Sequence, residues 1–139
     1  MRVSSSVVIG AAPELVAAVY CNVDRWPEIF PTIHGVRVTS RDDRVVEVDV
    51  DHDEGLVPNT LTRVGPHRVI LSESKRLYDA DFDNRFDAVD GGTRFTVIGD
   101  IRLKGALRIL APIARYRARR LMLRYQLVPV KDAAESRTG

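Results

Sequence analysis

The stretch that decides the fold is VIGAAPELVAAVYCNVDRWPEIFPTIHGVRV, residues 8–38. Its first apolar run is typical of a strand, and Pro13 and Glu14 then favour the first turn of a helix. The chain's only tryptophan, Trp26, follows in a segment that can form no more than a short helical turn, because Pro31 stops it. This stretch therefore predicts one strand followed by two short helices.

The periodicity changes to two between residues 34 and 103. Val46 and Val50 alternate with acidic residues, and Phe82 and Phe86 do the same further along the chain. Such alternation indicates antiparallel strands with one buried face and one wet face. Separated by turn signals, six such strands follow the helices in a meander, and the first strand brings the predicted sheet to seven.

The last element is predicted to be a long helix over the basic C-terminal region. Its apolar residues fall on one line at helical spacing, and Pro129 is expected to bend or end the helix. The tail from about residue 132 is expected to be frayed. The predicted apolar stripe consists of Leu107, Leu110, Ala114, Ala118, Leu121, Tyr125 and Val128.

These elements predict one α+β domain over residues 1–139, in which a curved antiparallel sheet wraps around the C-terminal helix. The length suits a single core. No run reaches the roughly 18 apolar residues of a membrane span, and the N-terminal apolar run is too short for a signal peptide, so we expect a cytoplasmic protein. Cys21 stands alone, and the three histidines are scattered, so no disulfide, metal or cofactor is expected.

The charge is unevenly distributed although the net charge is only +2. Residues 1–101 hold 17 acidic and 11 basic side chains, whereas residues 102–124 hold eight basic and no acidic ones. The outer side of the predicted helix mixes arginines with apolar groups. Three explanations of this mixed surface remain open: a solvated face, a homodimer contact, or docking on an anionic membrane. Binding to nucleic acid is not expected. The residues are Arg108, Arg115, Arg119, Arg120, Ile109, Tyr116, Leu123 and Leu127.

The opening stretch, the later GGTRFTV and the long terminal helix together resemble the START/polyketide-cyclase superfamily, also called SRPBCC or Bet v 1-like. The resemblance covers residues 2 to about 134 and is greatest to the bacterial polyketide cyclase/dehydrase branch. It implies a helix-grip fold with an apolar cavity between sheet and terminal helix. That fold hosts cyclases and lipid carriers alike, so it does not decide the activity.

The resemblance also indicates residues for a ligand site. Trp26 and Phe30 would line or cover the cavity, or else simply fill the core. Inward strand positions and the helix stripe supply the rest of the predicted wall. The complete set of predicted ligand-binding residues is Trp26, Phe30, Val48, Val50, Leu61, Phe82, Phe86, Phe95 and Leu121.

Three residues are candidates for catalysis. Arg63 points inward if Leu61 does, and the resembling cyclases carry an arginine on this strand that holds a polyketide carbonyl or enolate; the opposite parity would leave Arg63 in solvent. Asn84 has inward parity, and its buried amide needs partners that a ligand could supply. Where those enzymes have a tyrosine this chain has Ile33, so Tyr125 is the substitute proton donor, unless it only packs.

The sequence thus predicts a protein that binds a hydrophobic, aromatic or polycyclic small molecule in an internal cavity. One interpretation is a polyketide aromatase/cyclase or dehydratase that needs no metal or organic cofactor. The alternative is a non-catalytic lipid or quinone carrier whose basic helix meets the membrane. The residues leave open whether the protein is an enzyme.

Overall fold

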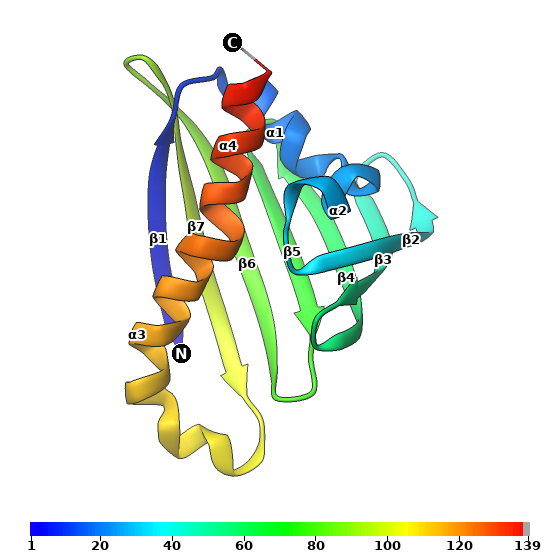
Figure 1. Ribbon diagram of the computed structural model, residues 1–139, viewed down its shortest axis with the longest axis vertical. Helices are drawn as coiled ribbons and strands as arrows, with labels where there is room; N and C mark the ends of the chain where they lie inside the picture. Colours follow the sequence, from blue (N-terminus) through cyan, green and yellow to red (C-terminus); the bar gives the residue numbers. More distant parts are fainter. Residues whose placement is uncertain (138–139) are drawn as a thin grey trace.

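A seven-stranded antiparallel sheet curves around one side of the C-terminal helix (Figure 1). The computed structural model describes residues 1–137. Strand order in the sheet is β1-β7-β6-β5-β4-β3-β2, so the first strand pairs with the last and the others follow as a meander. The α+β class, the seven strands and the two short helices after the first strand are all confirmed.

The strands are β1 (Arg2–Ile9), β2 (Ile33–Arg41), β3 (Val45–His52), β4 (Gly55–Gly65), β5 (Arg68–Ser74), β6 (Tyr78–Val89) and β7 (Gly92–Leu103). Between β1 and β2 lie α1 (Pro13–Cys21), the 3-10 turn η1 (Val23–Arg25) and α2 (Trp26–Ile29). After β7 come the 3-10 segment η2 (Gly105–Leu110), α3 (Ala111–Met122), the π turn η3 (Leu123–Leu127) and α4 (Val128–Ser136).

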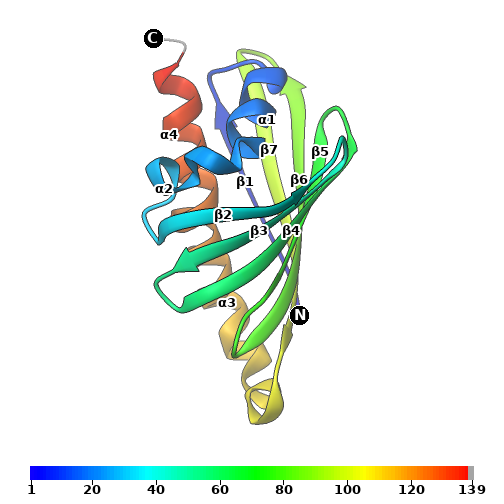
Figure 2. The same cartoon turned by 90° about the vertical axis from the view of Figure 1, so that its right-hand side faces the viewer.

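The sheet is curved (Figure 2). Its buried side chains form one core cluster with those of the helices. Val48 and Val50 of β3 and Phe82 and Phe86 of β6 are buried, while the acidic residues between them are more exposed. Strand β2 forms one edge of the sheet, and its pairing with β3 shifts register twice, at Ile33/Gly35 and at Val38/Ser40. The predicted alternation therefore holds on the central strands and is interrupted at this edge.

The terminal helix does not end at Pro129. Because proline has no N–H, the regular ladder cannot continue through it, and the chain widens into a π turn immediately before it. In that turn the Val128 N–H donates to the carbonyl of Leu123, five residues back. The extra residue shifts the buried face of the helix, so Met122 and Leu127, also five apart, are both buried.

The π turn corrects two sequence-based expectations. Leu127 was expected on the outer side and Val128 on the inner stripe, but Leu127 is fully buried and Val128 is 37% exposed. The frayed tail from about residue 132 is also wrong as far as the helix extends, because α4 continues to Ser136 and buries Val130 and Ala134. The last two residues of that predicted tail, 138–139, lie outside the described part of the chain.

The core lies under α4 and α1. Phe86 of β6 stacks on Phe95 of β7 with ring centroids 5.1 Å apart, and Tyr20 of α1 lies 6.0 Å from each. The indole N–H of Trp26 donates to the Tyr20 carbonyl at 2.8 Å, which fixes α2 against the end of α1. These contacts close one half of the concave face with side chains of the protein itself.

A glycine at the start of β7 permits the close approach of β1. Gly92 has φ +153°, and a Cβ there would lie 2.0 Å from the carbonyl oxygen of Ile9. We expect Gly92→Ala to lower the free energy of unfolding by about 3 kcal/mol, because backbone must move. Gly65→Ala meets no atom within 4 Å and is the matched control, with an expected change under about 1 kcal/mol. Urea denaturation measures both; equal losses would contradict the close approach.

Candidate functional site

A pocket of about 470 Å³ lies between the concave face of the sheet and α3. On α3 the wall consists of Ala114, Arg117, Ala118, Leu121 and Met122, and the small side chains of the two alanines leave space between the layers. Beyond the π turn the helix presents Leu127 and Val130 instead, and there the layers are in contact. The molecule therefore has a filled half under α4 and an open half under α3.

The structure divides the predicted ligand-binding residues into two groups. Trp26, Phe30, Val50, Phe82 and Leu121 line the pocket. The other four are buried in the filled half, where α1 covers the inward face of the sheet: they are Val48, Leu61, Phe86 and Phe95. Strand parity gave their direction correctly but could not tell which length of each strand the helix covers.

Arg63 is not part of the pocket wall. It follows Leu61 in parity, but Arg63 is exposed, and its neighbour is Cys21, the last residue of α1. There the exposed guanidinium lies beside the Cys21 thiol; burial raises the pKa of that thiol and Arg63 opposes the rise. Arg63 is therefore not among the residues that line this pocket, and its contact with a ligand carbonyl stays a prediction.

Asn84 is fully buried but also stands outside the wall. Its amide N–H groups donate to the carbonyls of Phe82 at 3.0 Å and Val69 at 3.3 Å. Its side-chain oxygen has no hydrogen-bond partner among the described residues. The side chain lies next to the hydroxyl of Tyr20, and it is Tyr20 that lines the pocket; burial raises the pKa of that hydroxyl far above its usual range.

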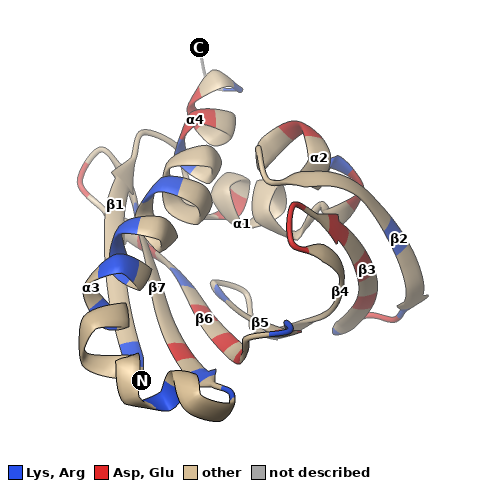
Figure 3. Cartoon of the chain, turned by 60° about the horizontal axis from the view of Figure 1, so that its bottom comes forward, with Lys and Arg blue, Asp and Glu red and all other residues tan. Residues whose placement is uncertain are grey.

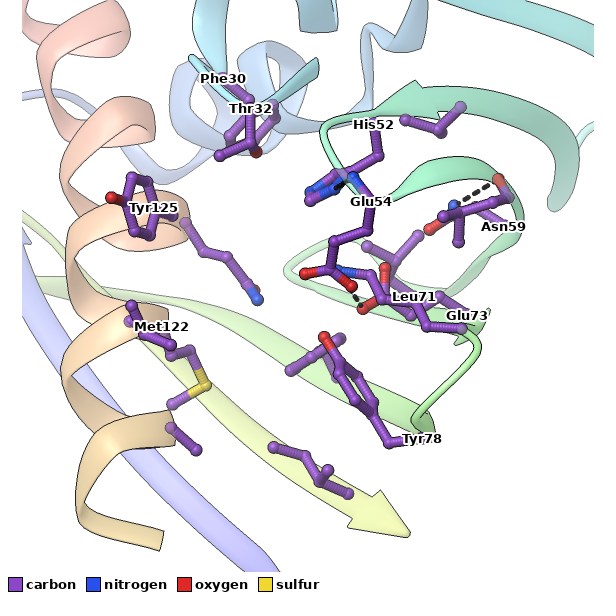
Figure 4. Close-up of a pocket in the computed structure, with 18 of the residues that line it drawn as sticks. Phe30, Thr32, His52, Glu54, Asn59, Leu71, Glu73, Tyr78, Met122 and Tyr125 are labelled. Carbon is purple, nitrogen blue, oxygen red and sulfur yellow. Dashed lines mark hydrogen bonds and ion pairs between the residues drawn. The ribbon is translucent and has the colours of Figure 1, made fainter. Parts of the chain in front are cut away.

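The helix side of the pocket ends at the π turn. Tyr125, the predicted proton donor, is half-buried and lines the pocket together with Met122 (Figure 4). Its neighbour Gln126 also lines the wall, and the side-chain oxygen of Gln126 is buried without a hydrogen-bond partner among residues 1–137. An unpaired acceptor at a cavity wall is a position where a ligand donor can bind.

The sheet side of the pocket carries a cluster of charges from two hairpin ends. In the β5–β6 hairpin the Lys75 N–H donates to the Tyr78 carbonyl at 2.8 Å, which places these two side chains on the same face. Lys104 holds the hairpin from β7, since its ammonium donates to the Lys75 carbonyl at 2.7 Å. The neighbouring β3–β4 turn brings Glu54 to the same place.

The buried ammonium of Lys75 lies between two carboxylates. Its Nζ is 3.7 Å from an oxygen of Glu73 and 3.7 Å from an oxygen of Glu54, and only 8% of its side chain is exposed. The Nζ also lies 5.3 Å from the centre of the Tyr78 ring. Figure 4 shows Glu54 and Tyr78 reaching from the sheet toward the pocket.

This surrounding shifts the pKa of each group. Burial raises the pKa of Glu73, which Lys75 partly opposes. Burial alone would lower the pKa of the Lys75 ammonium, but Glu73, Tyr78 and Glu54 outweigh it and raise that pKa. Burial, followed by the charge of Lys75, lowers the pKa of His52, whose Nδ1 accepts the Glu54 N–H at 3.3 Å. The cluster is therefore a buried ammonium paired with a carboxylate whose pKa is raised by burial.

Sequence reasoning missed Glu73, Lys75 and Tyr78, although a signal was present. Glu73 and Lys75 continue the inward parity of Val69 and Leu71, so two charged residues stand where an apolar side chain is expected. Tyr78 likewise shares the parity of Phe82. An ionisable residue in an inward strand position is a candidate for function.

Several solved structures have the same arrangement of strands and helices as this chain. One of them is the di-domain aromatase/cyclase StfQ of the steffimycin pathway, with TM-score 0.82 and 19% identity over 99% of this chain and 51% of StfQ. The Zhui aromatase/cyclase of Streptomyces sp. R1128 matches with TM-score 0.80 and 18% identity over 100% of this chain and 96% of that one. The chain has the helix-grip fold.

A START superfamily protein of Mycobacterium smegmatis shares the helix-grip fold, with TM-score 0.72 and 15% identity over 98% of this chain and 95% of that one. This chain spans about half the length of StfQ. A comparison with protein-family models finds no match, and neither does a comparison with curated proteins. At these identities the likeness establishes the fold, and the activity has to be argued from the pocket.

The described part of the helix-grip chain has neither a group of metal-ligating side chains nor a membrane-spanning helix. Within residues 1–137, no three side chains of His, Cys, Asp or Glu are grouped so that they could hold a metal ion. In the same range, no helix has the length and apolar character needed to cross a bilayer.

The division of the helix-grip interior into filled and open halves can be measured. Phe86 is fully buried against Phe95, so Phe86→Ala should lower the free energy of unfolding by about 3–5 kcal/mol. Phe82→Ala should cost less, because the Phe82 ring already borders the pocket and lacks neighbours on that side. Urea denaturation of both variants checks the order, and a larger loss for Phe82→Ala would contradict it.

Proposed function

We propose that the protein binds an aromatic or polycyclic small molecule in the pocket under α3. The observation that carries this proposal is the pocket of about 470 Å³, which falls in the range of small-molecule sites. Its wall is mostly apolar, with aromatic rings of Trp26 and Phe30 at one side and the charged hairpin ends at another. Such a wall suits a flat apolar body that bears oxygen atoms.

The reaction proposed for this ligand is that of a polyketide aromatase/cyclase or dehydratase. The likeness in fold to StfQ and Zhui supports it. The wall would hold a flexible chain in the folded form needed for ring closure, which lowers the entropic barrier. Tyr125 remains the proposed proton donor, because its half-buried ring lines the pocket. No metal or organic cofactor enters this proposal.

Filling the pocket tests binding. Ala118→Phe places a ring in the space that Ala118 leaves, and should raise the Kd for alizarin, a dihydroxyanthraquinone, at least about tenfold, equivalent to about 1.4 kcal/mol. Quenching of the single tryptophan, Trp26, reports occupancy because its ring lines the pocket. Ala18→Phe on the exposed side of α1 is the control and should bind as the unchanged protein does. Equal Kd values for the two variants would contradict the site.

A second candidate function is that of a lipid or quinone carrier that meets a membrane. The observation in its favour is a surface that we call the basic tip, which consists of the exposed residues Arg108, Ile109, Ile113, Arg115 and Arg119 of η2 and α3. Its apolar residues Ile109 and Ile113 are 82% and 77% exposed. Figure 3 shows Lys and Arg at several positions along α3. A hollow of about 330 Å³ extends from pocket residues Ile101 and Leu103 to Arg108, so the tip adjoins the pocket.

Vesicle binding tests the carrier candidate. The expected result is sedimentation with phosphatidylglycerol vesicles but not with phosphatidylcholine vesicles, since each basic side chain near an anionic surface contributes about 1 kcal/mol that salt screens. Arg115→Glu with Arg119→Glu, and separately Ile109→Ser with Ile113→Ser, should abolish it. Leu56→Ser, a 70% exposed site on the β3–β4 hairpin, is the control.

A homodimer through the same surface predicts a different outcome. An apolar contact is little affected by salt, so a dimer would persist at high salt in light scattering and would dissociate on Ile109→Ser with Ile113→Ser. A monomer that binds neither vesicle type would contradict both the carrier and the dimer, and the tip would then be a solvated face.

A further inference from the structure

Binding of an apolar ligand does not require the charged cluster of Lys75, Glu73 and Glu54 at the hairpin ends. The Lys75 ammonium has three N–H donors, and both neighbouring carboxylate oxygens, on Glu73 and Glu54, lie at 3.7 Å, beyond hydrogen-bonding distance. A buried ion pair contributes to stability only when its geometry and hydrogen bonds are good. These separations leave room for a further oxygen atom beside the ammonium, on the pocket side.

Glu73 is the second half of the arrangement. Its side chain is 12% exposed and lines the pocket, next to the apolar side chain of Leu71 and opposite α3. Ser72 and Ser74, its neighbours along β5, point to the other face of the sheet, where they donate to Asp81 and Asp79. Within residues 1–137, Lys75 is the one cation that forms an ion pair with Glu73.

We propose that Glu73 and Lys75 enolise a ketone held in the pocket, with Glu73 as the base and Lys75 as the donor to the enolate oxygen. This inference rests on the proposed ligand binding and adds a substrate class to it: ketones with a hydrogen on the carbon beside the carbonyl. Glu73 takes that proton, the C–H electron pair becomes the C=C bond, and the carbonyl oxygen receives the negative charge. No oxidant, reductant or further reactant is needed.

The charge balance favours this step. Before it, the negative charge is on Glu73; after it, the same charge is on the ligand oxygen, and Lys75 lies beside it in both cases. The total charge of the cluster is unchanged, so the low-polarity wall does not have to accept a new ion. An enolate carbon formed in this way can attack a second carbonyl of the same chain, which is the bond-forming step of aldol ring closure.

Deuterium exchange tests enolisation without requiring the natural ligand. β-Tetralone, a bicyclic ketone, is incubated in D2O at neutral pH, and loss of its α-proton signals is followed by NMR. The protein should accelerate exchange over buffer by about a hundredfold, the low end for general base catalysis. Glu73→Gln should return the rate to that of buffer, and Lys75→Met should lower it at least about tenfold. Glu47→Gln, an exposed site on β3, should leave the rate unchanged.

The pH dependence gives a second readout. The base acts when Glu73 is deprotonated, so the rate should rise with pH through the pKa of Glu73 and then level off. Because burial raises that pKa, the midpoint should lie above the usual glutamate range. The groups that face Glu73 are Lys75 and Glu54 at the hairpin ends, Tyr78 on β6, Tyr20 on α1, His52 on β3 and Arg117 on α3.

The outcomes separate this inference from ligand binding. If β-tetralone quenches Trp26 but exchange equals that of buffer, enolisation is overturned and binding stands. Exchange that survives in Glu73→Gln overturns the role of Glu73, provided that the variant binds β-tetralone with unchanged Kd. If neither β-tetralone nor alizarin binds, both proposals fall. A rate that is lost only in Glu73→Gln and Lys75→Met, with binding retained, supports the assignment.

Discussion

The contact of Leu127, Val130 and Ala134 with α1 and β1 holds the C-terminal helix across the sheet, and the open space on the concave face depends on it. Polar contacts reinforce this attachment. The Glu135 carboxylate accepts the Gly10 N–H at 2.8 Å, and the Lys131 ammonium donates to the Val8 carbonyl at 2.9 Å. With α4 held in this way, α3 extends over the sheet, and its small residues Ala114 and Ala118 leave part of the space beneath it open.

The charged cluster has a similar origin in local geometry. A two-residue hairpin places Lys75 opposite Tyr78, and strand alternation places Glu73 on the same face two residues earlier. The β3–β4 turn, which belongs to another hairpin, contributes Glu54. The charges of Glu54, Glu73 and Lys75 therefore meet without a long loop. Such short-range positioning gives a rigid site, because each side chain comes from a hydrogen-bonded strand end.

The sequence predicted the sheet well because its central strands are half-buried, and burial on one face leaves a period-two pattern that a single chain displays. It predicted inward directions for Val50, Phe82 and Phe86 alike. Which of these borders a space could not be predicted, because that depends on the helix opposite each position. The same limit applies to Arg63, which does not line the pocket. The helical period predicted the wrong side for Leu127, because a π turn inserts one residue and Pro129 alone does not indicate such a turn.

The register shifts in β2 have a consequence for how the protein behaves at high concentration. An open sheet has two edges, and a flat edge strand offers its free backbone groups to the edge of another molecule. At one edge, β1 is contacted by α3 and α4. At the other, two register shifts interrupt the pairing of β2, and Arg37 and Arg41 of this strand are exposed. Edge-to-edge strand addition, the first step toward aggregation, is therefore opposed at both ends of this sheet.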